Sequence, residues 1–292
     1  MRQVKYILIA IATPIILLYA CNERFDDIKT VATEDRIVVE SFISNIDSFS
    51  VRLTRTTDFP SADDVPTISD ATVMIIDDLD DTVSLTETFV GSGIYQSNDT
   101  GVVGRSYQLS ITVDSVTYQS PFVLMLPVAT IDELFIRQDF DDYDGEYFAF
   151  ACVQDEKDTR DFYIWFYDTY KKDGAGGIDE SKTIVNYDVI DDLLFNGIST
   201  CDDDSLFAEV NDEPFESVDT FLVMQQYHVD EDAADYWNQV LIQTQFVGGP
   251  FDVPPSPIIG NVRNVEDQND YTLGYFMVGG KDIDTVIVPE IE

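Results

Sequence analysis

Short β-forming runs separated by turn residues place the strongest limit on how this chain can fold. Seven such runs follow one another in the first half, at residues 36–43, 50–56, 71–77, 82–89, 93–96, 106–113 and 116–124. In the sixth run, apolar residues from Tyr107 to Val113 alternate with polar ones, which is typical of a strand with one buried and one wet face. Seven short strands within ~90 residues predict an antiparallel, immunoglobulin-like β-sandwich over residues 36–127.

The second half, residues 128–292, predicts a larger β-rich domain that carries one packed helix. Aromatic runs at 147–153 and 161–167 read as strands, and the second is apolar enough to be central in a sheet. A helix is expected over 232–243, because its acidic first turn suits the helix dipole and its apolar residues fall on one stripe. The predicted fold class is therefore mainly all-β, with two domains that meet near residues 127–129.

Residues 1–20 have the pattern of a signal peptide, in which a basic start is followed by an apolar run from Tyr6 to Ala20. That run is shorter than the roughly 20 residues that cross a bilayer as a helix. The stretch Leu18-Tyr19-Ala20-Cys21 resembles the bacterial lipobox, in which cleavage precedes a cysteine that carries a diacylglycerol. We therefore expect a lipid on Cys21 and a polar, lipid-anchored tether over residues 21–35. An uncleaved membrane anchor and an ordinary secretory signal are the alternatives.

The charge of the chain limits its partners. The sequence has 16 basic and 56 acidic residues, and removal of Arg2 and Lys5 with the signal peptide lowers the net charge from −40 to −42. Such a surface repels nucleic-acid phosphates and anionic lipid head groups, so nucleic acid is excluded as a partner. Hydrophobic residues make up 45% of the chain, which is enough to form a sizeable core despite the charge.

Two cysteines remain once Cys21 carries a lipid. Cys152 and Cys201 form an even pair in an oxidising compartment, which makes them a candidate disulfide. Two free, buried thiols are the alternative, because sequence alone cannot place their Cα atoms.

No catalytic constellation emerges from the sequence, so we expect a protein that is not an enzyme. His228 is the only histidine, no G-x-S-x-G motif accompanies it, and its position before an acidic helix start favours a capping or surface role. One histidine and two spare cysteines argue against catalytic zinc. With so many acidic residues, sequence spacing cannot identify a catalytic carboxylate pair.

Calcium is a better hypothesis for the acidic residues than catalysis, but a solvated loop in an unusually acidic protein is the simpler explanation. Hard oxygen ligands surround the flexible Gly145, as Ca²⁺ prefers, but their spacing does not match an EF-hand. These candidate metal ligands are Asp139, Asp141, Asp142, Asp144 and Glu146.

An aromatic binding face is a further hypothesis. Tyr163, Trp165, Tyr167 and Tyr170 alternate in and around one predicted strand, where a sugar or a peptide could stack on them. Burial of the same side chains in the core of the second domain is the alternative.

Several stretches, in order along nearly the whole chain after the signal peptide, resemble a known family. They are Val38–Ser41, Ile68–Val73, Gly93–Ser97, Gly104–Leu109, Tyr118–Ser120, Tyr236-Trp237 with Gln243, Phe251–Pro257, Gly260–Val262 and Leu273–Phe276. Together they are similar to the Bacteroidota lipoprotein family known as domain of unknown function 4249. The resemblance implies an outer-membrane lipoprotein that is encoded beside TonB-dependent receptors that import nutrients, and it supplies no catalytic residues.

The expected function is that of a non-enzymatic accessory, which binds a ligand or the transporter itself in a TonB-dependent uptake system. The expected location is the outer membrane, lipid-anchored on the periplasmic face or at the cell surface. The helix and the loop Gly248–Pro257 are candidate contact elements, because exposed loops on rigid scaffolds usually carry binding. The alternatives are a structural or adhesive acidic surface protein that binds divalent cations and, third, a hydrolase.

Overall fold

The computed structural model describes residues 35–57, 65–139, 146–157, 159–172, 178–194, 196–200, 208–209, 220–245 and 257–287. The described residues from Asp35 to Ile287, with the exception of Thr57, belong to one compact unit. The secondary structure is mainly β with one long helix, as the sequence predicts. No helix within the described ranges is both long and apolar enough to cross a membrane.

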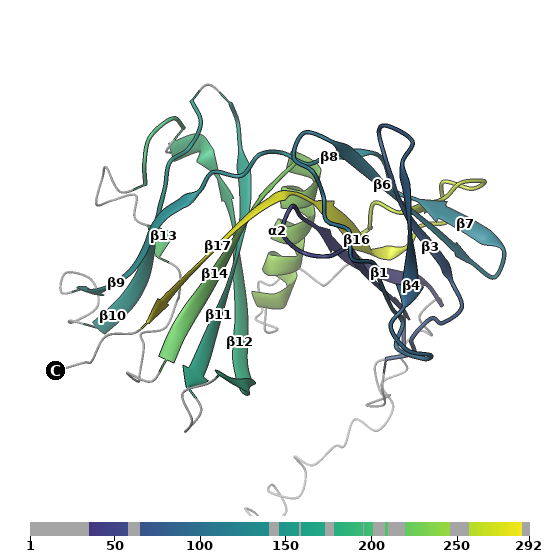
Figure 1. Ribbon diagram of the computed structural model, residues 1–292, viewed down its shortest axis with the longest axis horizontal. Helices are drawn as coiled ribbons and strands as arrows, with labels where there is room; N and C mark the ends of the chain where they lie inside the picture. The colour runs from purple at the N-terminus through teal and green to yellow at the C-terminus, as the bar shows by residue number, and fades with distance from the viewer. Residues whose placement is uncertain are drawn as a thin grey trace, which may run out of the picture. The chain divides into compact units, whose positions relative to one another are not determined.

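The first sheet has ten strands, drawn in Figure 1 from purple to blue with a yellow strand at one edge. They are β1 (Ile37–Ile43), β2 (Ser50–Arg55), β3 (Thr72–Asp77), β4 (Thr82–Glu87), β5 (Ile94–Gln96), β6 (Ser106–Val113), β7 (Val116–Gln119), β8 (Val123–Leu124), β15 (Arg263–Asn264) and β16 (Leu273–Val278). Their order is β15-β7-β6-β3-β4-β5-β2-β1-β16, and β8 pairs with β6. A core of mostly aliphatic residues, including Val39, Leu53, Leu109 and Ile111, lies inside this sheet.

The strands of this sheet are hydrogen-bonded in one continuous, curled array instead of two separate sheets. The link is β4, which pairs with β3 along most of its length and with β5 at its end, where Thr86 and Glu87 oppose Gln96 and Tyr95. The strands predicted between residues 36 and 124 are all present. A sandwich would have two separate sheets, but here β4 joins the two groups of strands by pairing with both β3 and β5. Closing an edge in this way removes unpaired backbone groups from the sheet.

The sequence predicts hairpins at Asp114-Ser115 and at residues 77–81, where turn residues separate two β-forming runs, and both are confirmed. Asp114 and Ser115 join β6 to β7 with positive φ angles of 50° and 69°, and Asp80 has a φ of 65° in the turn from β3 to β4. Two consecutive residues with positive φ form the two-residue turn whose twist matches a β-hairpin. Aspartate tolerates this conformation better than most residues because its side chain is short and polar.

The first sheet includes residues far beyond the predicted boundary at 127/128. Strand β16 pairs in parallel with β1 along its whole length, from Val38 opposite Leu273 to Ile43 opposite Val278. Gly274 allows this pairing, since a Cβ there would overlap the backbone of Val39. The sequence pattern could not reveal this contact, because a parallel pair between distant strands carries no local turn signal.

The chain passes directly from the first sheet into a four-stranded sheet at Gly279. The latter contains β11 (Phe162–Lys172), β12 (Ile178–Asp191), β14 (Thr220–Val229) and β17 (Gly280–Ile287), in the order β12-β11-β14-β17 (Figure 1). A three-stranded sheet contains β9 (Ile131–Asp139), β10 (Glu146–Val153) and β13 (Ala208–Glu209), in the order β13-β10-β9. Side chains of these two sheets share a core that includes Ala149, Val153, Trp165 and Met224.

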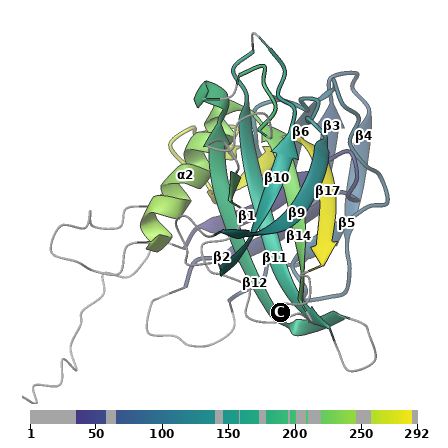
Figure 2. The same cartoon turned by 90° about the vertical axis from the view of Figure 1, so that its left-hand side faces the viewer.

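Helix α2 (Glu231–Gln245) covers the other face of the four-stranded sheet, beside β11 and β12 (Figure 2). Asp230 caps its first turn through a hydrogen bond from the Ala233 N–H to its carboxylate oxygen, at 2.9 Å. An aromatic cluster lies beneath the helix, in which Trp237 contacts Phe42, Phe166 and Tyr187. Strand β11 is therefore buried on both faces, which explains its continuously apolar sequence.

Candidate functional site

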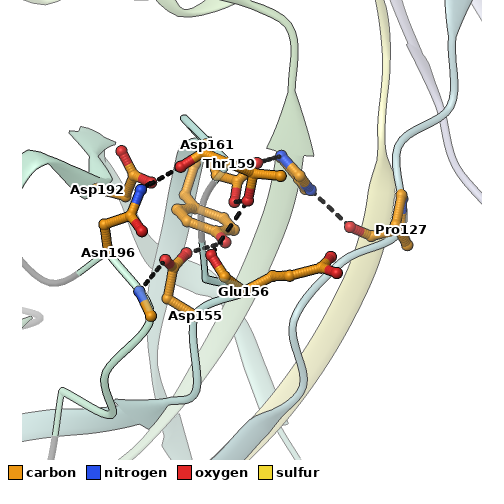
Figure 3. Close-up of polar contacts among 10 residues, drawn as sticks. Pro127, Asp155, Glu156, Thr159, Asp161, Asp192 and Asn196 are labelled. Carbon is orange, nitrogen blue, oxygen red and sulfur yellow. Dashed lines mark hydrogen bonds and ion pairs between the residues drawn. The ribbon is translucent and has the colours of Figure 1, made fainter.

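Three buried aspartates converge at one end of the four-stranded sheet (Figure 3). Asp155 follows β10, Asp161 directly precedes β11, and Asp192 directly follows β12 in a short 3-10 helix, η1 (Asp192–Leu194). Their exposed fractions are 3%, 7% and 1%. One carboxylate oxygen from each lies within 4.8 Å of the others. Because β11 pairs with β12 here, with Phe162 opposite Asp191, the sheet register itself brings Asp161 and Asp192 together.

Each of the three carboxylates accepts a hydrogen bond that fixes its orientation. Asp155 accepts from the Tyr163 hydroxyl at 2.7 Å and from the Gly197 N–H at 3.0 Å. The Thr159 hydroxyl donates to Asp161 at 2.6 Å, and the side-chain amide of Asn196 donates to Asp192 at 2.9 Å. Several of these contacts are visible in Figure 3. These donors fix the orientation of the three carboxylates.

His228 of β14 joins the cluster from the neighbouring strand. Its Nδ1 lies 2.5 Å from the Pro127 carbonyl oxygen, and its Nε2 lies 3.1 Å from Asp161 Oδ1. The imidazole is buried, with a side-chain exposure of 8%. The predicted capping or surface role for His228 is therefore wrong: the residue lies inside β14, two residues before the helix cap, and points into the protein.

Burial dominates the electrostatics of this cluster. Desolvation raises the pKa of the Asp192 carboxyl, and the nearby charges of Asp155, Asp161 and Asp191 raise it further. Desolvation also raises the pKa of the Tyr163 hydroxyl, and the hydrogen bond to Asp155 raises this pKa further. The hydroxyl therefore keeps its proton and donates it to Asp155 in the hydrogen bond. Among the described residues, His228 is the only group able to carry positive charge that forms an ion pair with any of the three aspartates.

A second feature is a polar hollow of about 740 Å³ beside the start of α2. Carboxamides, carboxylates and aromatic rings form its walls, and they come from the sheet edge, the helix and the segment before β15. The lining residues are Gln108, Gln119, Ser120, Pro121, Asp232, Asp235, Tyr236, Gln239, Ile259, Gly260, Asn261, Arg263, Val265, Gln268 and Tyr275. Such a mixture of amide groups, acids and aromatic faces suits a polar organic ligand.

Two tyrosines give this hollow an aromatic wall. The rings of Tyr236 and Tyr275 lie 4.5 Å apart between centroids. Burial raises the pKa of the Tyr236 hydroxyl to about 12, with a further contribution from the charge of Glu40, so this hydroxyl stays protonated at neutral pH. The helix that the sequence marks as a contact element thus contributes Asp232, Asp235 and Gln239 to the hollow. Most of the loop Gly248–Pro257 lies outside the described residues.

The aromatic residues considered as a binding face lie in the protein interior. Tyr163, Trp165 and Tyr167 have exposed fractions of 2%, 1% and 2%, and they pack between the three-stranded and four-stranded sheets. Tyr170 is half-buried and stacks on Phe221, with 5.4 Å between ring centroids. A ligand cannot reach the three buried rings, so their alternation reflects the core face of β11.

Most of the other candidate residues lie outside the described residues. Cys152 is buried and disulfide-bonded, while Cys201, its predicted partner, is outside the described residues, as is Cys21. Thr200 lies next to the disulfide, because its backbone N–H donates to Val153 at 3.0 Å and its hydroxyl donates to Ala151 at 2.9 Å. Of the predicted calcium ligands, Asp141, Asp142 and Asp144 are outside the described residues, and Asp139 and Glu146 end β9 and begin β10.

Sequence reasoning did not identify Asp155, Asp161 or Asp192. Among 56 acidic residues, three aspartates spread over nearly forty positions carry no local signal. The one available signal was an aspartate at each end of the apolar run in β11. A continuously apolar run predicts a strand that is buried on both faces, so the residues at its ends are also expected to be buried.

The sequence profile of the family described as "Domain of unknown function (DUF4249)" matches residues 24–283, which confirms the resemblance noted in the sequence. No curated protein matches the chain. A solved structure, that of a DUF4785 family protein from Legionella pneumophila subsp. pneumophila str. Philadelphia 1, is 10% identical, with a TM-score of 0.25. That match covers 66% of this chain and 52% of the other, so the chain spans about half the length of that protein.

Proposed function

The chain belongs to the DUF4249 family, and on that premise we propose that it is an outer-membrane lipoprotein that acts without catalysis in a TonB-dependent nutrient uptake system. In this role it binds a ligand or the transporter itself. The lipid on Cys21 anchors it, and the polar residues up to Asp35 act as a tether. The resemblance to the family implies the neighbouring TonB-dependent receptor.

The observation that carries this proposal is the hollow of about 740 Å³ beside α2. Its size falls within the range of small-ligand sites, roughly 300–1,000 Å³. Its walls combine several carboxamides with the ring pair of Tyr236 and Tyr275, a set that binds polar ligands by hydrogen bonds and stacking. Asp232 and Asp235 favour a neutral or cationic ligand over an anion, since Arg263 is the only basic residue among the described residues of the wall.

The experiment is co-purification from intact outer membranes after chemical cross-linking, with the protein expressed at its natural level. We expect the protein to bring down an outer-membrane β-barrel receptor. Because the helix is the candidate contact element, we also expect Asp235→Arg, a charge reversal at an exposed position of α2, to lower the yield of the receptor at least 10-fold.

Asp78→Arg is the matched control, because Asp78 is also an exposed aspartate but lies in the turn after β3, outside the lining of the hollow. It should co-purify like the wild type. Recovery of the wild-type protein from intact membranes without any β-barrel partner contradicts the proposed role. An equal loss of receptor in both variants contradicts the assignment of the receptor contact to α2.

A further inference from the structure

The turn between β4 and β5 exposes two adjacent apolar side chains to solvent. Phe89 is 68% exposed and Val90 is 91% exposed. A Cβ added at Gly91, the next residue, would meet no atom within 4 Å, so the turn projects into open space. Single exposed apolar residues need no explanation, whereas an aromatic and an aliphatic residue side by side at the tip of a hairpin form a small apolar surface.

Hydrogen bonds hold this turn in one conformation. The Ser92 N–H donates to the Phe89 carbonyl oxygen at 3.0 Å and closes the turn. The Gly91 N–H donates to the Ser69 hydroxyl oxygen at 3.0 Å, and the Thr67 hydroxyl donates to the Gly91 carbonyl oxygen at 2.9 Å. Gly91 has a φ of 89°, a conformation that glycine adopts without strain. The two apolar side chains are thus presented on a fixed turn.

The hairpin that carries the turn has almost no charge. From Thr82 to Ser97 the only charged residue is Glu87, although 56 of the 292 residues in the chain are acidic. The Glu87 carboxylate accepts from the Ser69 hydroxyl at 2.8 Å and from the Gly93 N–H at 2.9 Å, so protein donors hold it. Charged groups are the ones that make transfer out of water expensive, so this tip can leave water at low cost.

Strand pairing places the turn at the end of the first sheet where the chain enters it. Strand β1 begins beside the end of β2, with Ile37 opposite Arg55. Strand β5 is antiparallel to both β2 and β4, so β4 ends at that same end of the sheet. Val65 adds a third exposed apolar side chain there, because the carbonyl oxygen of the next residue, Pro66, accepts from the Arg55 N–H.

The lipid proposed on Cys21 limits which end of this sheet lies near the bilayer. Cys21 and Asp35 are 14 positions apart, so the chain between them spans at most about 50 Å when fully extended. A flexible chain of that length has a mean end-to-end distance of roughly 20 Å. The end of the sheet that follows the tether is therefore kept close to the membrane, and Phe89 and Val90 lie at that end.

We propose that Phe89 and Val90 insert into the lipid surface that holds the Cys21 anchor. This inference rests on the lipid anchor of the proposed function and adds an orientation to it, because contact at the turn limits rotation of the protein about its tether.

The charges at the same end of the sheet set the depth of this contact and the kind of lipid. Arg55 pairs with Asp35 and Asp114, at 3.2 Å in both cases, and Asp70 is exposed. These acidic residues confine the insertion to the tip of the turn and favour zwitterionic lipids over anionic ones.

Leu79 offers a matched comparison at the other end of β4. It is 62% exposed and lies in the turn from β3 to β4, so it is also an apolar residue that faces solvent from a hairpin turn. Exposure alone therefore does not distinguish the two turns. What distinguishes them is their position relative to the point where the chain enters the sheet.

The test uses the full lipidated chain in phosphatidylcholine vesicles, with a nitrobenzoxadiazole dye on Val90→Cys or on Leu79→Cys. The unsubstituted chain, treated with the same dye, gives the background from the native cysteines. Lipids with brominated acyl chains quench a dye that lies in the bilayer. We expect about 3-fold stronger quenching of the dye at position 90 than at position 79, because side chains that bind a lipid surface lie at the boundary of head groups and acyl chains.

A second substitution tests whether the apolar pair causes the insertion. Phe89→Asp, added to Val90→Cys, should reduce the quenching to the level of the dye at position 79, because a carboxylate resists transfer out of water. Both positions are exposed, so these variants should fold like the wild type. Quenching that is unchanged by Phe89→Asp contradicts the role of the pair.

The remaining outcomes separate this inference from its premises. Equal quenching at the two positions, or stronger quenching at position 79, contradicts the orientation. A dye at position 90 that is shielded from water but not quenched by brominated lipids shows that a protein covers the turn, and also overturns the proposal. A chain that does not float with the vesicles removes the lipid anchor and this inference together, whereas a floating chain with an unquenched dye at position 90 removes this inference alone. None of these measurements depends on the receptor.

Discussion

Asp77 in the first sheet and the three aspartates beside His228 are similarly hidden from solvent, yet their surroundings are opposite. Asp77 is 5% exposed and accepts from the N–H groups of Leu79 and Asp81 and from the guanidinium of Arg105. Desolvation alone would raise its pKa, but these donors outweigh it, and the pKa lies below the ordinary value of 3.8. The three aspartates of the cluster face one another, and only Asp161 is shown paired with the His228 imidazole.

The hydrophobic cores beside these aspartates also differ between the two regions. The core of the first sheet is mostly aliphatic, and its buried carboxylate closes a hairpin turn. The core between the three-stranded and four-stranded sheets contains Tyr163, Trp165 and Tyr167, whose polar atoms need partners inside the protein. Tyr163 and Tyr167 donate to Asp155 and Asp188, so aromatic packing and buried acids come together in this region. Local donors thus lower the pKa of the buried carboxyl in the first region, whereas burial and neighbouring carboxylates raise the pKa of Asp192 in the second.

The largest expected effect is on the aromatic core. Trp165→Ala should lower the free energy of unfolding by about 4 kcal/mol, because it leaves a large cavity. It also removes the indole hydrogen bond to Gln226, which is 2.8 Å long. Urea unfolding measures the change. Tyr170→Ala, on the same strand but half-buried, is the control and should cost about 1 kcal/mol. Equal losses would show that β11 presents a surface face where we describe a core.

Asp77→Asn should have the next largest effect, a loss of stability at pH 7 that shrinks in acid. A depressed carboxyl pKa contributes stability above the unfolded-state pKa, and this contribution is lost as the pH falls through the folded-state pKa. Wild type and variant should therefore converge in thermal midpoint below about pH 3. Asp81→Asn, in the same turn but 78% exposed in its side chain, should change little. A constant difference at every pH would contradict this account of Asp77.

The smallest effect, with the opposite trend, is expected for Asp168→Asn. Asp168 is 8% exposed, one carboxylate oxygen accepts from Tyr170, and burial raises its pKa despite that bond. A raised carboxyl pKa destabilises the protein at neutral pH, and this cost is relieved as the pH falls through the folded-state pKa. The stability difference should therefore shift in favour of the wild type on acidification, as thermal unfolding from pH 7 to pH 4 can measure. A parallel trend for Asp77→Asn and Asp168→Asn would break the comparison between the two regions.

Local sequence patterns predicted the strands, the hairpins and the helix well. The alternation from Tyr107 to Val113 gave β6, and the acidic turns gave the reversals at Asp80 and at Asp114-Ser115. The helix expected over 232–243 is observed as Glu231–Gln245. These features depend on side-chain period and on backbone preferences of neighbouring residues, which the sequence contains directly.

The candidate sites could not be predicted in this way. His228 was assigned to the surface because the acidic helix start follows it, but β14 extends to Val229 and carries the imidazole inward. The hollow combines Gln108, Gln239 and Asn261, which are far apart along the chain. Asp155, Asp161 and Asp192 meet only because β11 pairs with β12 in one register.

The sequence by itself therefore determined the mainly β class, the positions of most strands, the helix observed at Glu231–Gln245 and membership of the family. Only the tertiary structure decided that β16 returns to β1, that β4 closes the first sheet into one curled array, and that three buried aspartates meet, with His228 beside Asp161. The physical reason is the range of the interactions. Turn and strand preferences act over a few residues, whereas strand pairing joins residues such as Val38 and Leu273, which are 235 positions apart.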